Sequence, residues 1–307
     1  MTGSVVILGA FVADTAYRAE RQPRIGETIL GQNFALGPGG KGSNQAVAAA
    51  RAGADTTMLT RLGQDAFGEM ALSLWAEAGV TPEVIRQADG YTGAAFIFLE
   101  AATGNNAIII CPGAAATISP ADVDGWGETI ARARVFMTQL EQPIDAAVRG
   151  LELARRAGAT TILNPAPAAI LPDGMLALSD WVTPNESEAE GLTGIAVTST
   201  DSAEAAAKAL IARGAGAAII TLGSNGVYLY DGTAGQHLPV MPAGPVVETT
   251  GAGDAFNGGF AAALAGGAAP REAVRFGLAT AGISVTRPGT APSMPTRAEI
   301  DALLARA

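Results

Sequence analysis

The stretch "ETTGAGDAFNGGF", residues 248–260, places one carboxylate, Asp254, among glycines at the start of an apolar helical run. Glycine is disfavoured inside helices, so glycines at a helix start indicate that the backbone approaches another group closely. The free N–H groups of such a turn, together with the helix dipole, attract an anion. Because helix capping by Asp254 would not need flanking glycines, the stretch predicts an anion site with an acid beside it.

The same stretch also begins a dinucleotide-binding pattern, GxGxxG, with Gly251 and Gly253. The third glycine is replaced by Phe256, and the residues before the pattern form only a weak strand. The pattern also lies at the wrong end of the chain for a nicotinamide-binding fold. We therefore do not expect a dinucleotide site.

Elsewhere in the chain, buried-strand patterns alternate with helical patterns. The strand patterns cover 4–10, 55–63, 134–141, 160–167, 180–186 and 217–226, the helical ones 42–52, 67–78, 144–157 and 202–213, and the chain is helical again from 251 onwards. Strands that alternate with helices of about 10 to 15 residues are typical of a parallel sheet covered on both faces. The sequence thus predicts a three-layer α/β/α fold with a mostly parallel central sheet.

Two segments break this alternation. Residues 27–36 and 91–111 are rich in β-forming residues, and "ATGNN" at 102–106 is a hairpin signal. No Pro/Ser/Gly linker separates them from the rest of the chain. We expect a small second sheet that grows out of a single domain spanning 1–307.

Composition excludes several classes of function. The chain has 307 residues and a net charge of −10, which opposes binding to nucleic acid or an anionic membrane. Its single cysteine, Cys111, and single histidine, His237, exclude an internal disulfide and a Cys- or His-based metal site. No apolar run is long enough for a transmembrane helix, and the first residues resemble no signal peptide. We expect a soluble cytoplasmic protein.

A glycine-rich segment, "GPGGKGSNQA" at 37–46, is not a P-loop because Lys41 is followed by Gly42 rather than Ser or Thr. Lys41, Ser43 and Asn44 at a helix N-terminus are suited to hydrogen-bonding a polyhydroxyl ligand. A glycine turn that only caps the helix is the alternative, although it leaves Lys41 and Asn44 without a role.

Two further motifs are less specific. In "TPNESEAE", Asn185 and Glu188 share one face of a helix start, where they could hold a hydrated Mg²⁺ or form a capping box, and both interpretations stay open. In "ITLGSNG", Thr221, Gly223 and Ser224 follow a strand, at the edge where parallel sheets bind ligands.

Together these motifs resemble the ribokinase branch of the PfkB sugar-kinase family over essentially the whole chain. The matching segments are "GGKGSNQA", "NPAPA" at 164–168, "TPNESEAE" and "TGAGDAFNGG". The resemblance implies a β-sheet lid formed by about 12–38 and 91–111, transfer of the ATP γ-phosphate to a sugar hydroxyl, and a homodimer joined through the lids.

The resemblance also assigns roles to residues. Asp254 becomes the base that takes the proton of the sugar hydroxyl, and the amides of Gly251, Ala252 and Gly253 form an anion hole. Sugar contacts fall to Asp14, Gly40, Lys41, Asn44, Glu141 and Asp254; nucleotide contacts to Asn185, Thr221, Gly223, Ser224 and Gly253; Mg²⁺ to Asn185 and Glu188; and K⁺ to Glu248, Thr250, Ser284, Arg287, Gly289 and Ser293.

Two residues depart from the family pattern. Glu248 replaces an Asp at the K⁺ site, and Val12 replaces an Asn that helps to hold ribose. Losing a polar contact to a sugar hydroxyl weakens binding if that hydroxyl is left unpaired. Ribose is the leading substrate, and another pentose, a ketohexose or a nucleoside remains open. A non-catalytic sugar- or nucleotide-sensing protein on the same fold is the alternative from a different class.

Overall fold

The main sheet of the protein contains nine strands in the order β13-β12-β11-β10-β9-β8-β1-β4-β5. The computed structural model describes residues 3–306. The strands are β1 (Ser4–Leu8), β4 (Asp55–Gly63), β5 (Val80–Gln87), β8 (Val135–Thr138), β9 (Thr160–Leu163), β10 (Trp181–Val182), β11 (Ala217–Thr221), β12 (Val227–Tyr230) and β13 (Gly235–Leu238). All neighbouring pairs from β5 to β11 are parallel, whereas β12 and β13 pair antiparallel at one edge.

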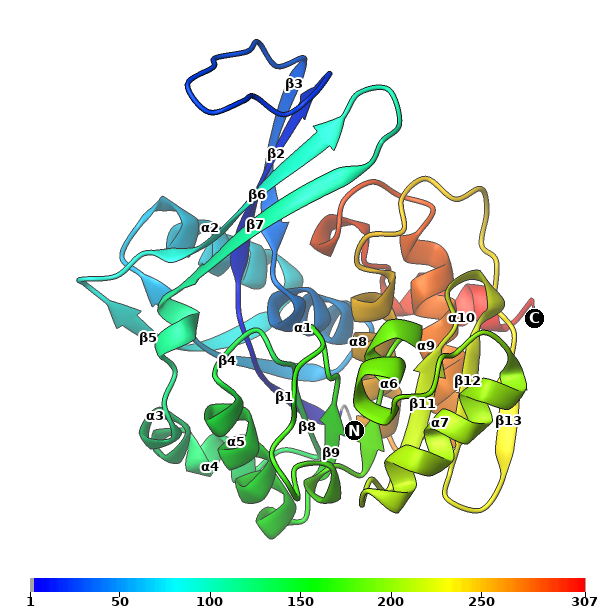
Figure 1. The fold of residues 1–307 in the computed structure, drawn as a ribbon. Helices are drawn as coiled ribbons and strands as arrows, with labels where there is room; N and C mark the ends of the chain where they lie inside the picture. The colour runs from blue at the N-terminus through cyan, green and yellow to red at the C-terminus, as the bar shows by residue number, and fades with distance from the viewer. Residues whose placement is uncertain (1–2, 307) are drawn as a thin grey trace.

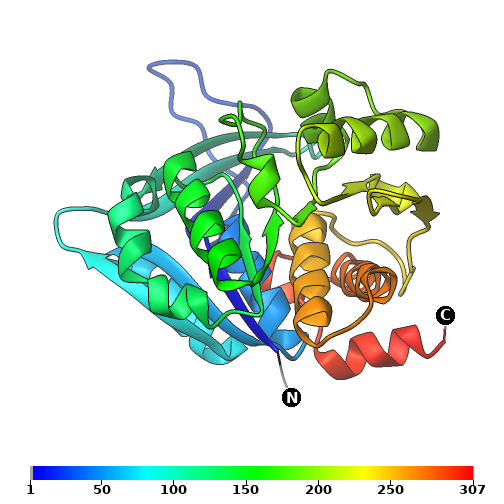
Figure 2. The same ribbon diagram turned by 90° about the horizontal axis from the view of Figure 1, so that it is seen from below.

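Helices cover both faces of this sheet (Figures 1 and 2). One face packs against α1 (Lys41–Arg51), α2 (Ala66–Ala78), α8 (Ala252–Ala265), α9 (Pro270–Ser284) and α10 (Arg297–Leu304), the other against α3 (Pro120–Gly125), α4 (Gly127–Ala131), α5 (Ile144–Ala157), α6 (Glu186–Thr193) and α7 (Thr200–Ala212). A hydrophobic core lies on each face of the sheet. Side chains of β1 alternate between them, with Val5 and Ile7 in one core and Val6 and Leu8 in the other. The predicted three-layer fold is confirmed.

A second, four-stranded sheet projects from one end of the molecule (Figure 1). Its strands are β2 (Val12–Ala19), β3 (Asn33–Gly39), β6 (Thr92–Glu100) and β7 (Asn106–Gly113), in the order β3-β2-β6-β7. The hairpin predicted within 91–111 is present as β6 and β7. The strand predicted over 27–36 is wrong in its first half, because β3 begins only at Asn33.

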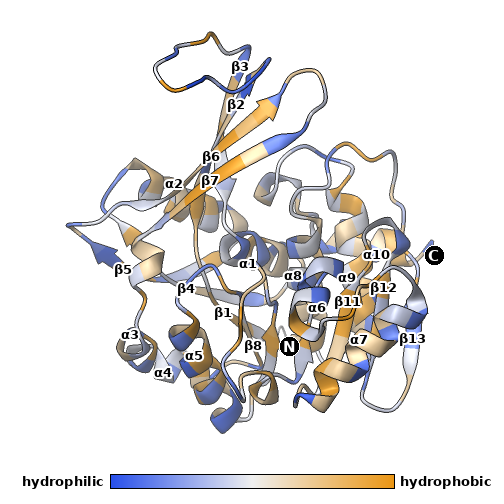
Figure 3. Ribbon diagram, in the orientation of Figure 1, coloured by the Kyte–Doolittle hydropathy of each residue, from blue (hydrophilic) through white to orange (hydrophobic). Residues whose placement is uncertain are grey.

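The two sheets are joined directly, because β1 continues through Gly9 into β2. Asp14 and Tyr17 lie on opposite faces of β2, as side chains alternate along a strand. Tyr17 belongs to an apolar face on which its ring lies 5.0 Å from Phe34 and 5.5 Å from Phe96, between ring centroids. We call this the outer face; it also carries Leu36 and Ile109, and β6 and β7 are its most hydrophobic strands in Figure 3.

Helices α1 and α8 pack with their backbones unusually close. A Cβ atom added at Gly258 would lie 2.4 Å from Ala48 Cβ and 2.6 Å from the carbonyl oxygen of Gln45. Both distances are below van der Waals contact, so only glycine allows this approach. Asp254 is one helical turn before Gly258, and the contact therefore sets Asp254 against the N-terminal half of α1.

The edges of the main sheet differ most from the prediction. Strands β5, β12 and β13 were not expected. In addition, the strands predicted over 134–141, 160–167 and 217–226 are shorter than expected, because they end at Thr138, Leu163 and Thr221. Their remaining residues form the loops at the carboxyl ends of the strands. Within residues 3–306, no helix is both long and apolar enough to cross a membrane.

Candidate active site

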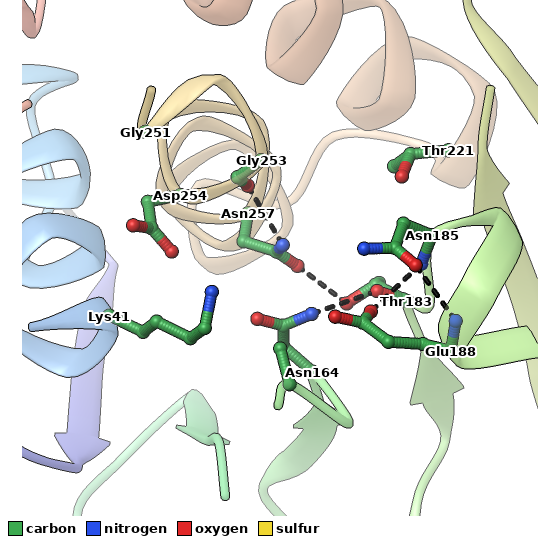
Figure 4. A pocket seen from close by; sticks show the side chains of 11 residues that line it. Lys41, Asn164, Thr183, Asn185, Glu188, Thr221, Gly251, Gly253, Asp254 and Asn257 are labelled. Atoms are coloured by element: carbon green, nitrogen blue, oxygen red, sulfur yellow. Dashed lines mark hydrogen bonds between the residues drawn. The ribbon is translucent and has the colours of Figure 1, made fainter. Parts of the chain in front are cut away.

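A pocket lies at the carboxyl ends of β9, β10 and β11, opposite the N-termini of α1, α6 and α8 (Figure 4). This is the edge at which open parallel sheets bind their ligands. The pocket is lined by Lys41, Asn164, Ala166, Thr183, Asn185, Glu188, Thr221, Gly251, Gly253, Asp254 and Asn257. All four sequence motifs thus contribute to one site.

Asp254 is a buried carboxylate in the first turn of α8, with 7% of its surface exposed. Both of its oxygens accept hydrogen bonds from α1: Asn44 Nδ2 donates to Oδ2 at 3.0 Å and Gln45 Nε2 to Oδ1 at 2.9 Å. The donors are neutral amides. Asp254 is therefore held in place without a salt bridge, and Figure 4 shows it facing Lys41.

The N-terminus of α8 is open toward the pocket. Its N-cap residue is Gly251, which has a left-handed φ of 80° and offers no side-chain cap. The Ala252 amide donates to the Thr249 carbonyl at 3.1 Å, whereas the Gly251 and Gly253 amides have no acceptor among residues 3–306. A Cβ at Gly253 would meet no atom within 4 Å. The Gly251 and Gly253 amides are thus available to an anion, while the Ala252 amide bonds within the turn; an anion hole formed by the amides of Gly251, Ala252 and Gly253 stays a prediction.

The predicted sugar-binding residues come together beside Asp254. Glu141 Oε2 accepts a hydrogen bond of 2.7 Å from the Lys41 amide, and Gly40, with a φ of 87°, leaves room for Ala10 and Val12 behind it. Burial, with smaller contributions from neighbouring carboxylates, raises the pKa of Glu141 to about 7 and that of Asp14 to about 6. Carboxyl groups held this far from water are suited to accept hydrogen bonds from sugar hydroxyls.

Two further features of this polar region concern Asn44 and Asp14. Asn44 Oδ1 is buried and accepts no hydrogen bond from the part of the chain that the structure describes, residues 3–306. A Cβ at Gly39 would lie 2.3 Å from Asp14 Oδ2, so glycine at 39 is what allows the Asp14 carboxylate to lie flat against β3. A buried acceptor without a partner costs free energy that a donor on a ligand would recover.

The side chain of Lys41 extends into the pocket, below Asp254 in Figure 4. Burial opposes its charge, but Asp254, Glu141 and Glu188 outweigh that effect and raise the pKa of Lys41. The ammonium group is therefore charged and lies between two carboxylates of the pocket. It can pair with a further anion, such as a phosphate group.

Asn185 and Glu188 form a capping box at the start of α6. Asn185 Oδ1 accepts from the Glu188 amide at 2.8 Å, and Glu188 Oε2 accepts from the Asn185 amide at 2.9 Å. The second oxygen, Glu188 Oε1, accepts no hydrogen bond from residues 3–306, and burial raises the pKa of Glu188. The capping interpretation is confirmed, and one carboxylate oxygen still faces the pocket. Such an oxygen fits a water ligand of Mg²⁺.

Of the predicted nucleotide-binding residues, Asn185, Thr221 and Gly253 line the pocket, whereas Gly223 and Ser224 do not. Thr221 forms a parallel bridge with Asn185, and its amide donates to the Pro184 carbonyl at 2.9 Å. Gly223 and Ser224 follow in a short 3₁₀ turn, where Gly223 has a φ of 52° and is exposed. The strand exit of β11 is thereby joined to the start of α6.

The predicted K⁺ ligands lie on segments that meet behind the N-terminus of α8. Glu248 Oε2 accepts a hydrogen bond of 2.8 Å from the Gly289 amide, and the Val247 and Glu248 amides both donate to the Val285 carbonyl. The remaining predicted ligands are Thr250, Ser284, Arg287 and Ser293, of which Arg287 forms an ion pair with Glu299. Residues 3–306 contain no group of three or more His, Cys, Asp or Glu that could hold a metal. A K⁺ ion here would depend on carbonyl oxygens.

Several buried polar residues near Asp254 were not identified from the sequence. They are Gln45, Gln139, Thr183 and Asn257, which together with Asn164 form hydrogen bonds between α1, α8 and the strand ends. Gln45 is 94 residues from Gln139 and 209 from Asp254. No local pattern reveals such pairs; the only signal was a glutamine within an otherwise alanine-rich helix.

Comparison with known proteins identifies the family. The pfkB family carbohydrate kinase domain matches residues 2–297. A ribokinase of Haemophilus influenzae is 38% identical over 300 residues, covering 97% of both chains, and a deoxyribokinase of Salmonella typhi is 33% identical over 294 residues, covering 95% of both. A solved structure of Arabidopsis thaliana ribokinase complexed with ribose and ATP covers 99% of both chains at 32% identity, with a TM-score of 0.93.

These likenesses agree with the geometry of the pocket, where an acid and an open helix N-terminus face a cluster of buried polar groups. The expected resemblance is confirmed over the whole chain. The protein is an ATP-dependent sugar kinase, and it belongs to the pfkB family of carbohydrate kinases.

Proposed function

We propose that this protein is a ribokinase that transfers the ATP γ-phosphate to the 5-hydroxyl of D-ribose. The observation that carries the proposal is the position of Asp254, buried between sugar-binding side chains and the free amides of α8. A carboxylate placed there can accept the proton of a hydroxyl as that oxygen attacks a phosphoryl group. ATP as co-substrate is consistent with a cytoplasmic location.

In this mechanism the protein acts mainly by positioning and electrostatics. Asp14, Asn44 and Glu141 orient the sugar so that its hydroxyl faces Asp254. The Gly251 and Gly253 amides receive the negative charge that develops on the transferred group. Lys41, whose ammonium already lies in the pocket, neutralises part of the same charge.

Two metal ions are part of the proposal. Mg²⁺ supplies charge neutralisation at the phosphate oxygens, and Glu188 Oε1, with the Asn185 side chain, would hold its water ligands. K⁺ would be held by Glu248 and by carbonyl groups of the segments at 284–293. The support for K⁺ is indirect, since Glu248 already fixes Gly289 and thereby joins those segments to the turn before α8.

The second sheet supports a further part of the proposal, namely that it acts as a lid and joins two chains in a homodimer. Its outer face exposes large apolar side chains: Tyr17, Phe34, Leu36, Phe96 and Ile109 are 38–63% exposed. Contiguous apolar patches of this kind mark interaction surfaces. Phe96→Asp together with Ile109→Asp would leave a monomer in sedimentation velocity, and an unchanged dimer would contradict this arrangement.

The function is tested by an ADP-release assay over ribose, 2-deoxyribose, other pentoses, ketohexoses and nucleosides, each with and without Mg²⁺ and K⁺. We expect ribose to give the highest kcat/KM, with turnover that requires Mg²⁺ and increases with K⁺. Sugar binding without ADP release across the whole panel would instead support a sensing protein.

A second candidate substrate is 2-deoxyribose, and Val12 favours it. Val12 lies two residues before Asp14 on the same face of β2, so an apolar side chain stands near the sugar-binding carboxylate. An apolar neighbour suits a sugar carbon that lacks a hydroxyl. Val12→Asn would then raise the preference for ribose over 2-deoxyribose by about tenfold. An unchanged preference would remove Val12 from the specificity argument.

A further inference from the structure

We infer that Gln45 is a positioning residue for Asp254, and that Gln139 and Asn164 fix the direction in which its amide points. This inference rests on the proposed function, in which Asp254 is the base. Gln45 is fully buried, with 0% of its surface exposed. It is not among the residues that line the pocket, and its Nε2 donates to Asp254 Oδ1, so its expected effect on catalysis acts through Asp254.

The hydrogen bonds of Gln45 use its whole amide group. Nε2 donates both to Asp254 Oδ1 at 2.9 Å and to Asn164 Oδ1 at 3.0 Å, and Oε1 accepts from Gln139 Nε2 at 2.5 Å. Two hydrogens and one oxygen therefore have three partners. A reversed amide would place an oxygen against the oxygens of Asp254 and Asn164, which is repulsive.

The donor and acceptor ends of these side-chain amides are fixed by a backbone carbonyl, which can only accept a hydrogen bond. Asn164 Nδ2 donates to the Thr183 carbonyl at 2.9 Å, so Asn164 Oδ1 must point to Gln45. Gln45 must in turn present its nitrogen to Asn164 and Asp254. The orientation of each amide thus follows from its neighbour, starting at the strand end of β10.

A second series of hydrogen bonds also begins at Thr183 and leads to the turn that carries the proposed anion hole. Thr183 Oγ1 donates to Asn257 Oδ1 at 2.6 Å, and Asn257 Nδ2 donates to the Gly253 carbonyl at 2.9 Å. Hydrogen bonds therefore connect Thr183 to both parts of the site. Its carbonyl leads through Asn164 and Gln45 to Asp254, and its hydroxyl leads through Asn257 to Gly253. Thr183 and Asn257 are each 1% exposed, which keeps water from competing for these bonds.

The consequence for Asp254 is a defined carboxylate plane. With Asn44 on Oδ2 and Gln45 on Oδ1, rotation about the last side-chain bond would break both hydrogen bonds. The lone pairs that remain point away from α1, toward the pocket. A base held in this plane is already oriented toward the substrate hydroxyl. Such pre-orientation of the reacting groups accounts for a large part of the rate enhancement in intramolecular reactions.

The test compares three buried variants by kcat, by the KM values for sugar and ATP, and by melting temperature. Gln45→Met keeps the length of the side chain and removes the bond to Asp254; we expect kcat to fall 10- to 100-fold with both KM values within threefold. Gln139→Met keeps that bond but removes the donor to Gln45 Oε1, which loosens the Gln45 side chain, and we expect a smaller fall of about three- to tenfold. Thr161→Val is the control.

Thr161 is also fully buried, and its hydroxyl bonds to Leu178 and Asp180 at the opposite end of β9. We expect Thr161→Val to lower the melting temperature without changing kcat. The inference is overturned if the loss of kcat follows the loss of melting temperature across the three variants, or if Gln45→Met keeps kcat within threefold. It is equally overturned if Gln45→Met raises the KM for sugar as much as it lowers kcat.

Asp254→Asn separates this inference from the proposed function. If Asp254→Asn abolishes turnover while Gln45→Met does not change it, only the role of Gln45 is wrong. If Asp254→Asn retains wild-type turnover, the proposed base itself is wrong, whatever Gln45→Met does.

Discussion

The N-termini of α6 and α8 both carry a buried acid and both open onto the same pocket, but they use the acid differently. In α6, Glu188 caps its own helix and shares a reciprocal pair of bonds with Asn185. In α8, the cap is a glycine, and Asp254 is held by amides of another helix. The backbone amides at the start of α6 are hydrogen-bonded by side chains of the same helix start, whereas the start of α8 keeps backbone amides free for a ligand.

This difference separates a mainly structural acid, Glu188, from the proposed base, Asp254. An acid that bonds to its own helix stabilises the protein and has one oxygen left for a metal-bound water. An acid bonded from outside costs local stability, since the first turn of its own helix stays uncapped. The following predictions would break or sharpen this contrast.

Asp254→Asn has the largest expected effect, a loss of kcat of about 10³-fold, because the amide cannot accept the substrate proton. Single-turnover ADP formation measures it. Sugar binding by calorimetry should persist and shows that the variant is folded. Turnover near the wild-type level would make Asp254 no more catalytic than Glu188.

Glu188→Gln keeps the capping box, because glutamine serves as well at that position, so the melting temperature should hardly change. It removes the carboxylate charge near Mg²⁺. We expect kcat to fall by about 10- to 100-fold and the Mg²⁺ concentration for half-maximal rate to rise. A rate unchanged at low Mg²⁺ would show that Glu188 is only a cap.

Gly253→Ala should stabilise the protein by about 0.5–1 kcal/mol, since alanine favours a helix and a Cβ there meets no protein atom. The methyl group would occupy space in front of the free amides, and we expect kcat to fall about tenfold. Gly191→Ala in α6 is the matched control, because its Cβ would meet only Ala168 at 3.9 Å. That variant should gain stability at unchanged kcat; an equal loss of kcat in both would contradict the contrast.

The smallest expected effect concerns pH. Burial raises the pKa of Glu141 from 4.5 to about 7, so the folded state binds more protons than the unfolded state between those values. The contribution of Glu141 to stability is full below about pH 4.5 and is lost as the pH rises to about 7. The melting temperature of Glu141→Gln should therefore fall less between pH 5 and 8 than that of the wild type. Parallel curves would refute the shift.

Much of the fold could be predicted because its signals are local. Helix 144–157 and strand 55–63 have the predicted bounds, since hydrophobic periodicity and flanking glycines mark their ends. The edge strands β12 and β13 were missed: β13 is short and mostly exposed, and β12, although buried, is a four-residue apolar segment without alternation.

The site was only partly predictable for the same reason. Asp254, Lys41 and Asn185 lie in compact motifs, and the structure brings them into one pocket. The capping role of Glu188 and the use of the Ala252 amide by Thr249 depend on backbone geometry that the motifs do not encode. Gln45 and Gln139 become meaningful only when α1, α8 and β8 are packed together.

The contact of Gly258 with α1 has a consequence for how this protein tolerates mutation. Any side chain at 258 would push α1 and α8 apart and move Gln45 and Asn44 away from Asp254. Position 258 does not line the pocket, yet a saturation screen for activity would rank it with the proposed base, Asp254. A smaller residue at Ala48 would not relieve this clash, because the added Cβ would also lie 2.6 Å from the backbone carbonyl oxygen of Gln45; position 258 is therefore expected to accept only glycine.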